Sequence, residues 1–336
     1  MKSLAVKYRP KTFDDVQGQD TIKQILQHQV ETKTMQHGYL FCGGAGTGKT
    51  TCARIFAHSI NSIFDEDNLL TCTELDAASN NSVDDIRRIC ENANRQPVLS
   101  CYNIYIIDEC HSLSNQAWQA MLKTLEEPPA KAIFIFCTTN PEKIPQTILS
   151  RVQRYNFQKL DKKLVYDRLA YICEMENIEI ADSRALSYIT KLSNGGMRDA
   201  ITMLDICSSY SNKLTLETVE CALNTVSYDT LFKALDAILY NDERDNIFKF
   251  VDSIEKAGTD LKWFFKQFFE FTVDLSAYML HHDFDLVHIP DNYLDTINSY
   301  GDIRDQVIKI MRILKQLCND LKYEQNPKPI ILATFI

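Results

Sequence analysis

A glycine-rich phosphate loop constrains this chain more than any other feature of its sequence. Residues 43–50 read GGAGTGKT, an apolar run over 39–42 precedes them, and a helix-permissive stretch follows. This complete G-x-x-x-x-G-K-[ST] motif lets backbone N–H groups converge on phosphate oxygens. Lys49 can reach the β- and γ-phosphates, and the Thr50 hydroxyl can ligate magnesium, so we predict a site for ATP or GTP with Mg²⁺. Its predicted residues are Gly43, Gly44, Ala45, Gly46, Thr47, Gly48, Lys49, Thr50 and Thr51.

A pair of carboxylates argues against the alternative, a glycine-rich turn that matches the motif by accident. Residues 103–107 form an apolar run of strand length, and Asp108 and Glu109 follow it directly. In a parallel sheet this places both carboxylates beside the phosphate loop. Asp108 would hold magnesium through water, and Glu109 would orient and deprotonate an attacking water. The competing interpretation, in which Asp108 is only a strand-end turn residue, does not account for the glutamate next to it.

Composition limits the kinds of protein this chain can be. Its 336 residues are enough for two or three domains, and 45% hydrophobic with 24% charged residues is ordinary for a globular protein. No apolar stretch has the length of a membrane span, and the first residues lack the apolar core of a secretory signal. We expect a cytoplasmic protein without a membrane partner.

The eleven cysteines and seven histidines show no metal-binding spacing. There is no C-x-x-C pair, and several cysteines, such as Cys42 and Cys137, lie in apolar patterns. Thiols in such patterns behave as small hydrophobic groups in a reducing compartment. We expect them in the core.

The net charge of −9 is unevenly distributed. Residues 1–160 carry 17 basic and 17 acidic side chains, whereas residues 161–336 carry 19 basic and 28 acidic ones. All of the excess acid therefore lies in the second half. Overall charge neither supports nor excludes a local DNA-binding surface on the first half.

The hydrophobic pattern divides the chain into three parts. Over residues 1–160, helical periods alternate with short apolar runs at 38–42, 73–75, 103–107 and 132–137, which indicates an α/β unit with a parallel sheet. Trp118, Met121, Leu122 and Leu125 form one helix face that ends before two prolines. We expect a small helical domain over 161–225 and a second helical domain over 226–336. In the latter, polar residues every four positions from Lys262 to Asp274 line an otherwise aromatic helix.

Several motifs occur in the order found in AAA+ clamp-loader ATPases. Besides the phosphate loop and Asp108-Glu109, they are YRPKTFDDVQGQ at 8–19, MLKTLEEPP at 121–129, TTNP at 138–141 and ILSR at 148–151. The chain resembles this family over residues 1–210, and within it the bacterial DNA polymerase III gamma/tau subunits. The resemblance implies an α/β AAA+ P-loop NTPase domain over 1–160, a helical lid over 161–225 and an all-α collar over 226–336.

The resemblance also implies roles for residues outside the two motifs. Tyr8, Arg9, Pro10 and Val16 would line an adenine pocket, which makes ATP the expected nucleotide. Thr139, together with Asn140, would be the polar sensor that touches the γ-phosphate or the lytic water.

Two arginines receive roles in the same way. Arg198 would reach the γ-phosphate from the lid, although an ordinary surface arginine at a helix start is the alternative. Arg151 would act in trans as an arginine finger in the ATP site of a neighbouring subunit, because a guanidinium can neutralise charge that develops on the transferring phosphoryl. In this chain Val152 replaces the family's usual cysteine after that arginine, and we assign that cysteine no catalytic role.

One departure from the family lies between Ile60 and Thr73. The gamma/tau subunits carry a four-cysteine zinc module there, whereas this chain has Cys72 alone. We expect no structural zinc. A compact clamp loader, as in phages or in the small subunits of replication factor C, fits as well as a cellular bacterial one.

Two predicted helix starts are candidates for DNA contact. Ser82 precedes Arg87 and Arg88, and Ser114 and Asn115 begin the helix that carries Trp118. Helix N-termini attract phosphates, and by resemblance these elements track one strand of primed DNA. Arg87 and Arg88 are equally well explained as solvated helix charges.

The sequence therefore predicts an ATPase subunit of a sliding-clamp loader. Its expected partners are other clamp-loader subunits in a heteropentamer, the sliding clamp and primed DNA. Two alternatives remain: another AAA+ DNA motor, and a structural clamp-loader subunit that does not hydrolyse ATP. Retention of Lys49, Asp108 and Glu109 argues against the second.

Overall fold

The structure, a computed structural model, describes residues 3–61, 72–80, 82–97, 100–240, 245–256, 258–284, 287 and 289–335. The chain forms two compact units. The first comprises residues 1–178 and 189–205, and the second comprises residues 179–188 and 206–336.

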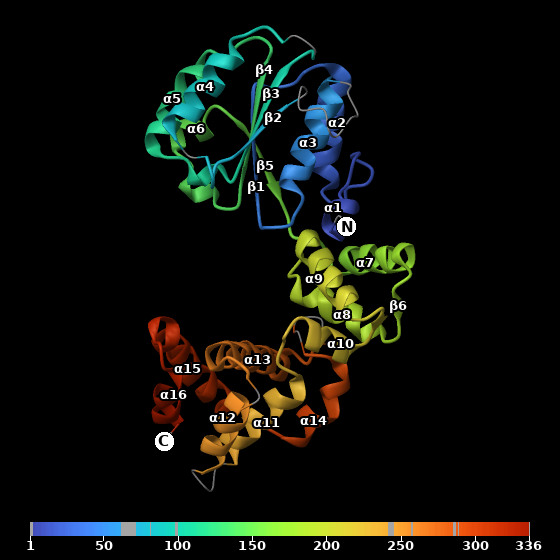
Figure 1. The fold of residues 1–336 in the computed structure, drawn as a ribbon, viewed down its shortest axis with the longest axis vertical. Coiled ribbons are helices and arrows are strands. Elements are labelled where there is room, and N and C mark those ends of the chain that lie inside the picture. Colours follow the sequence, from blue (N-terminus) through green and yellow to red (C-terminus); the bar gives the residue numbers. More distant parts are fainter. Residues whose placement is uncertain are drawn as a thin grey trace. The chain divides into compact units, whose positions relative to one another are not determined.

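A five-stranded parallel sheet forms the centre of the first unit. Its strands are β1 (Gly38–Gly43), β2 (Thr73–Asp76), β3 (Asn103–Asp108), β4 (Ala132–Thr138) and β5 (Gln153–Phe157). They lie in the order β2-β3-β4-β1-β5, and every neighbouring pair is parallel. All five carboxyl ends therefore meet at one edge, where the loops after β1, β3 and β4 converge (Figure 1).

Helices cover both faces of this sheet, as a buried parallel sheet requires. Helices α2 (Asp20–Thr32) and α3 (Lys49–Asn61) lie on one face, and α4 (Val83–Ala93), α5 (Asn115–Glu126) and α6 (Gln146–Leu149) lie on the other (Figure 1). Alternate side chains of β4 serve the two layers. Ile133 and Ile135 pack toward α3, whereas Phe134 and Phe136 pack toward α5, and all four are fully buried.

The other helical elements before residue 211 are α1 (Leu4–Lys7), the 3₁₀ turns η1 (Cys110–Ser112) and η2 (Pro141–Lys143), and the helices α7 (Lys162–Glu176), α8 (Ser183–Leu192) and α9 (Met197–Tyr210).

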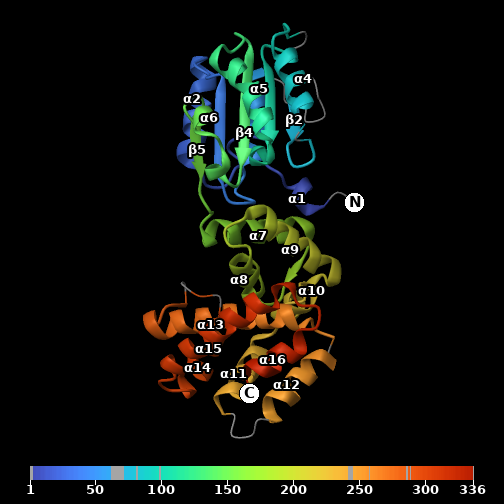
Figure 2. The ribbon, with the colours of Figure 1, turned by 90° about the vertical axis from the view of Figure 1, so that its left-hand side faces the viewer.

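The second unit is helical apart from a small parallel sheet of β6 (Glu179–Ile180) and β7 (Lys213–Leu214). Its longest helix is α13 (Leu261–His281), which lies beside α15 (Arg304–Asp320) (Figure 2). Phe264 and Phe268 of α13 are fully buried. The other elements are α10 (Leu216–Ala222), α11 (Tyr228–Leu239), α12 (Asp245–Lys256), η4 (Asp291–Tyr293), α14 (Leu294–Ser299), η5 (Leu321–Tyr323) and α16 (Pro327–Phe335).

The predicted fold class is confirmed, and the four expected apolar runs are β1 to β4. Sequence reasoning missed β5, because only Tyr155 and Phe157 of this edge strand are buried and polar residues separate them. The boundaries expected at residues 160 and 225 stay a prediction. Cys42 and Cys137 are buried, as expected. Among the helices of the described ranges, none is both long and apolar enough to cross a membrane.

Packing of β4 against α5 should dominate the stability of the first unit. Phe136 is fully buried, and its ring lies 5.5 Å from that of Trp118. Truncation of Phe136 to alanine should therefore lower the free energy of unfolding by about 3–5 kcal/mol. Denaturant titration followed by Trp118 fluorescence measures this in a Trp263→Phe background, which leaves Trp118 as the sole tryptophan of the chain. Ile25→Ala, at a side chain 39% exposed, is the control and should cost about 0.5 kcal/mol; similar losses in both variants would contradict the prediction.

Candidate functional site: a nucleotide pocket at the carboxyl edge of the sheet

A cavity of about 470 Å³ lies in the first unit beside the carboxyl ends of its strands. That volume is in the range of small-molecule sites. Its walls come from the N-terminal segment, the loop after β1, the ends of β2 and β3, and the start of α9. The predicted site residues that line it are Tyr8, Arg9, Pro10, Val16, Ala45, Gly46, Thr47, Gly48, Lys49, Thr50, Thr51, Asp108, Glu109 and Arg198.

The phosphate loop wraps around the ammonium group of Lys49. Lys49 Nζ donates hydrogen bonds to the carbonyl oxygens of Gly43 at 2.9 Å and Gly44 at 2.7 Å. Only 6% of Lys49 is exposed, and burial lowers the pKa of its amine, while the nearby Glu109 carboxylate opposes that shift. Gly43 and Gly44 do not line the cavity, but their carbonyl oxygens hold the ammonium group of Lys49, which does. A Cβ on Gly43 would meet the Phe157 carbonyl oxygen at 2.4 Å, so only glycine fits there.

Thr50 and Asp108 provide two hard oxygen ligands side by side. Thr50 Oγ1 donates a 2.8 Å hydrogen bond to Asp108 Oδ2, and the Glu109 backbone N–H donates to Asp108 Oδ1 at 2.9 Å. Hydroxyl and carboxylate oxygens next to a phosphate site are the donor set that Mg²⁺ prefers. The two residues therefore fit the magnesium ion predicted from the sequence.

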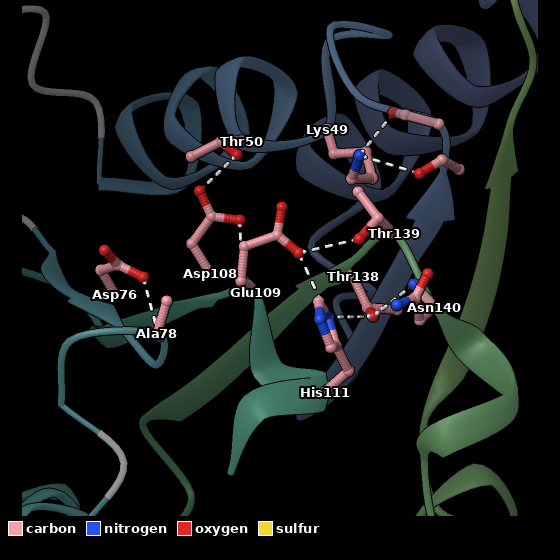
Figure 3. Close-up of polar contacts among 12 residues, drawn as sticks. Lys49, Thr50, Asp76, Ala78, Asp108, Glu109, His111, Thr138, Thr139 and Asn140 are labelled. Carbon is pink, nitrogen blue, oxygen red and sulfur yellow. Dashed lines mark hydrogen bonds and ion pairs between the residues drawn. The ribbon is translucent and has the colours of Figure 1, made fainter. Parts of the chain in front are cut away.

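One oxygen of the Glu109 carboxylate is held by residues outside the cavity wall. Its Oε2 accepts a 3.1 Å hydrogen bond from Thr139 Oγ1 and lies 3.2 Å from His111 Nδ1 (Figure 3). His111 Nδ1 also lies 3.2 Å from Thr138 Oγ1, which accepts a hydrogen bond from the Asn140 backbone N–H. Neither Thr139 nor Asn140 lines the cavity, and the Asn140 contact is made by its backbone.

The predicted adenine-pocket residues line the end of the cavity formed by the N-terminal segment. The Tyr8 hydroxyl donates to Glu176 of α7, and Lys7 Nζ lies 2.6 Å from the same carboxylate oxygen. Arg168 of α7 donates to the Tyr8 carbonyl at 3.2 Å. Burial, followed by the hydrogen bond to Glu176, raises the pKa of Tyr8 to about 12. Helix α7 thus fixes the segment that carries the predicted adenine pocket.

The start of α9 contacts the phosphate loop directly. The Met197 backbone N–H donates a 3.0 Å hydrogen bond to the Gly46 carbonyl, and a Cβ on Gly46 would lie 3.1 Å from the Gly196 Cα. This close approach places Arg198 in the wall of the cavity. Among the predicted site residues, Arg198 is the one that α9 brings to the phosphate loop.

Arg151 lies outside the cavity wall. It follows α6, where it pairs with Glu126 at 2.6 Å and donates to the Thr147 carbonyl at 2.5 Å. The structure thus separates Arg151 from the pocket of its own unit, and the expectation that it acts in trans stays a prediction.

The structure adds residues that sequence reasoning did not assign. Arg54 of α3 forms a two-point ion pair with Glu74 of β2, at 2.7 Å for each contact, and both side chains line the cavity. Arg168 and Asp76 line it as well. Arg54 lies five residues after Lys49 on the same helix, but nothing in the sequence pairs it with Glu74. His111 lies two residues after Glu109 in the sequence, and the sequence assigned it no role.

The candidate DNA residues lie on two neighbouring helices, α4 and α5: Ser82, Ser114 and Asn115 at their starts, and Arg87 and Arg88 in the middle of α4 (Figure 2). Ser82 and Ser114 cap these helices and accept hydrogen bonds from the backbone N–H groups of Asp85 and Ala117. Asn115 is the first residue of α5. Arg87 and Arg88 are exposed and lie 3.3 and 4.0 Å from Asp84 and Asp85. Their contact with DNA stays a prediction.

The expected absence of a zinc module concerns a segment of which residues 62–71 lie outside the described ones. Among the residues that the structure does describe, no group of three or more histidine, cysteine, aspartate or glutamate side chains is placed to hold a metal ion.

Two family models match the first part of the chain. The model described as DNA polymerase III, delta subunit, matches residues 18–161, and the RCF1/5-like AAA+ ATPase lid domain matches residues 167–209. The DNA polymerase III subunit gamma/tau of Mycoplasma genitalium is 37% identical over 81% of this chain, which spans 48% of that relative's length. The chain thus covers about half of that relative.

A shorter relative is covered more fully. The DNA polymerase III subunit gamma of Buchnera aphidicola is 34% identical over 74% of this chain and 72% of its own length. Among solved structures, the RuvB Holliday junction branch migration motor of Thermotoga maritima matches with a TM-score of 0.52 at 17% identity, over 75% of this chain and 86% of that one. That likeness concerns the fold. The chain belongs to the DNA polymerase III gamma/tau family of AAA+ ATPases.

Proposed function

We propose that this chain is an ATPase subunit of a sliding-clamp loader, in which ATP binding and hydrolysis drive the opening of a ring-shaped clamp and its loading onto primed DNA. The observation that carries the proposal is the presence of Lys49, the Thr50–Asp108 pair and Glu109 around one cavity. Membership of the gamma/tau family supports the link to replication.

The geometry supports a mechanism of water attack on the γ-phosphate. Lys49 would exchange the Gly43 and Gly44 carbonyls for phosphate oxygens as the triphosphate enters. Thr50 and Asp108 would hold Mg²⁺, which neutralises charge on the β- and γ-phosphates when bound. The oxygen of water bonds to the γ-phosphorus, the bond from that phosphorus to the bridging oxygen of ADP breaks, and Glu109 accepts a proton from the water.

Adenine would lie against Tyr8, Arg9, Pro10 and Val16, and Arg198 would reach the γ-phosphate from the start of α9. Because Gly46 is hydrogen-bonded to Met197, a change in the phosphate loop on nucleotide binding would pass directly to α9. Thr139 and Asn140, at the end of β4, would sense the γ-phosphate through their link to Glu109 and Thr138. Gly44, Ala45, Gly48 and Thr51 would complete the phosphate site.

Assembly would complete the machinery. We propose that residues 226–336 form a collar that joins the subunits of a heteropentamer, and that residues 161–225 form the lid. Arg151 would enter a neighbouring subunit's site. The N-terminal ends of α4 and α5, with Ser82, Arg87, Arg88, Ser114 and Asn115, would face the primed DNA.

Steady-state ATP hydrolysis by the complex reconstituted with its partner subunits tests this function. Clamp and primed DNA together should raise turnover well above the level with either one alone. Lys49→Ala should weaken ATP binding by about 10- to 100-fold, because it removes a charged donor to phosphate. Lys163→Ala, at an exposed lysine, is the matched control.

Two outcomes of that assay would contradict the proposal. ATP turnover that does not change on addition of the clamp would indicate another AAA+ motor. So would turnover that blunt or forked DNA stimulates as much as primed DNA does. No turnover in an intact assembly would indicate a structural subunit.

Arg151→Ala should leave ATP affinity unchanged, because Arg151 lies outside the cavity of its own unit. It should lower kcat of the assembled complex by about 10³-fold, the lower end of the range for arginine fingers. Nucleotide titration and DNA-stimulated hydrolysis measure the two effects separately. Arg95→Ala, at an exposed arginine, should change neither; unchanged DNA-stimulated turnover in Arg151→Ala would refute the assignment.

Replacement of Arg87 and Arg88 together by alanine tests the DNA surface. If each side chain neutralises one phosphate, the slope of log affinity against log salt should become shallower by about 2. Fluorescence anisotropy of labelled primed DNA across a salt series measures the slope for the assembled complex. Lys131→Ala with Lys143→Ala removes the same charge at exposed positions elsewhere in the unit and should leave the slope unaltered. Equal slopes in all three complexes would mean that Arg87 and Arg88 are solvated helix charges.

A further inference from the structure

The two oxygens of the Glu109 carboxylate have different surroundings. Oε2 contacts Thr139 Oγ1 and His111 Nδ1, neither of which belongs to the cavity wall. The other oxygen points away from this pair, on the side of Lys49 and Thr50 (Figure 3). Glu109 itself lines the cavity. One oxygen is therefore anchored while the other faces the space where an attacking water would lie.

The backbone around His111 fixes the position of its imidazole. Glu109 has a left-handed backbone with φ of 45°, and the 3₁₀ turn η1 follows it at once. The Ser112 N–H donates to the Glu109 carbonyl at 2.9 Å, and Cys110 is fully buried in the core. The turn thus brings His111 back over the residue two positions before it. Its side chain is only 16% exposed, so the imidazole has little freedom to leave this position.

The contacts of His111 Nδ1 determine which ring nitrogen carries the proton. Nδ1 faces the Glu109 carboxylate and the Thr138 hydroxyl, each at 3.2 Å. A bare Nδ1 would direct its lone pair at an anion, whereas a protonated Nδ1 donates to it. The second neighbour of Nδ1 is the hydroxyl of Thr138, a fully buried residue, and this hydroxyl already accepts a hydrogen bond from the Asn140 N–H. The arrangement with Nδ1–H directed at Glu109 satisfies the carboxylate.

We propose that His111 is a positioning residue for ATP hydrolysis. Through Nδ1–H, and together with the Thr139 hydroxyl, it holds Oε2 of Glu109 so that the other carboxylate oxygen is aimed at the attacking water. This role rests on the proposed ATPase function of the same site. His111 touches neither nucleotide nor water; it acts by restricting the rotation of Glu109. Loss of this restraint lowers the fraction of bound complexes in which the base is correctly oriented.

Three substitutions separate this role from a structural one. The side-chain nitrogen of asparagine can occupy the place of Nδ1, whereas that of glutamine corresponds to Nε2. His111→Ala and His111→Gln should therefore lower kcat of the complex with clamp and primed DNA about tenfold, by analogy with losses seen for partners that orient functional groups. His111→Asn should retain most of the wild-type kcat. KM and ATP affinity should stay unchanged in all three, because His111 does not line the cavity.

A second measurement tests whether His111 acts through Glu109. In a Glu109→Ala background, His111→Ala should cause no further loss, because the group that it orients is gone. A loss that multiplies with that of Glu109→Ala would overturn the proposal. So would an unchanged or raised kcat in His111→Ala, a loss that asparagine does not restore, or a rise in KM that accounts for the loss.

The wild-type complex separates this proposal from the proposed function. If wild type shows no hydrolysis that depends on clamp and primed DNA, the proposed function fails. If wild type is active and the His111 variants match it, only the role of His111 fails. Thermal unfolding and nucleotide binding of each variant verify that it is folded.

Discussion

Parallel pairing of β1 with β4, and of β4 with β3, is the constraint on which the site depends. Each strand delivers its last residues to the same edge of the sheet, so the phosphate loop, Asp108-Glu109 and Thr139 meet although they are distant in sequence. The pairing holds because the strands are buried on both faces; a shift of one residue would exchange the side chains of the two core layers. The hydrophobic layers thus determine which side chains meet at the nucleotide.

Charge organisation at this edge follows from the same geometry. Lys49 is buried next to two carbonyl oxygens and near Glu109, and burial lowers the pKa of its amine while the carboxylate opposes the change. The ammonium group in such surroundings forms stronger hydrogen bonds when the oxygens of a polyanion replace the neutral carbonyl oxygens. Asp108 and Glu109 bring negative charge to the same wall, which a divalent cation would balance. The site is thus arranged for a nucleotide together with its metal.

The sequence alone identifies the functional residues that belong to contiguous motifs. The phosphate loop and the two carboxylates after β3 were recognisable because their spacing is set locally, by one turn and one strand end. The sequence alone does not predict the contacts between segments that are distant along the chain. Glu176 accepts a hydrogen bond from Tyr8, 168 positions away in the sequence, and Arg54 pairs with Glu74 on another element. The edge strand β5 consists mostly of exposed polar residues, so it shows no apolar run. His111 follows Glu109 by only two residues, but its contact with the Glu109 carboxylate depends on the left-handed backbone of Glu109 and the turn after it.

The position of Arg151 suggests how one site can depend on two subunits without a large energetic barrier. Its guanidinium is paired with Glu126, an ion pair in which both side chains are partly exposed. Such pairs contribute only about 0–1 kcal/mol. Exchange of Glu126 for the phosphates of a neighbouring subunit would therefore cost little, and the phosphates offer more charge. Until a neighbouring subunit binds, the Glu126 carboxylate and the Thr147 carbonyl hold the Arg151 guanidinium in a defined position. Under the proposed function, hydrolysis would thus be limited by the arrangement of neighbours rather than by chemistry within one chain.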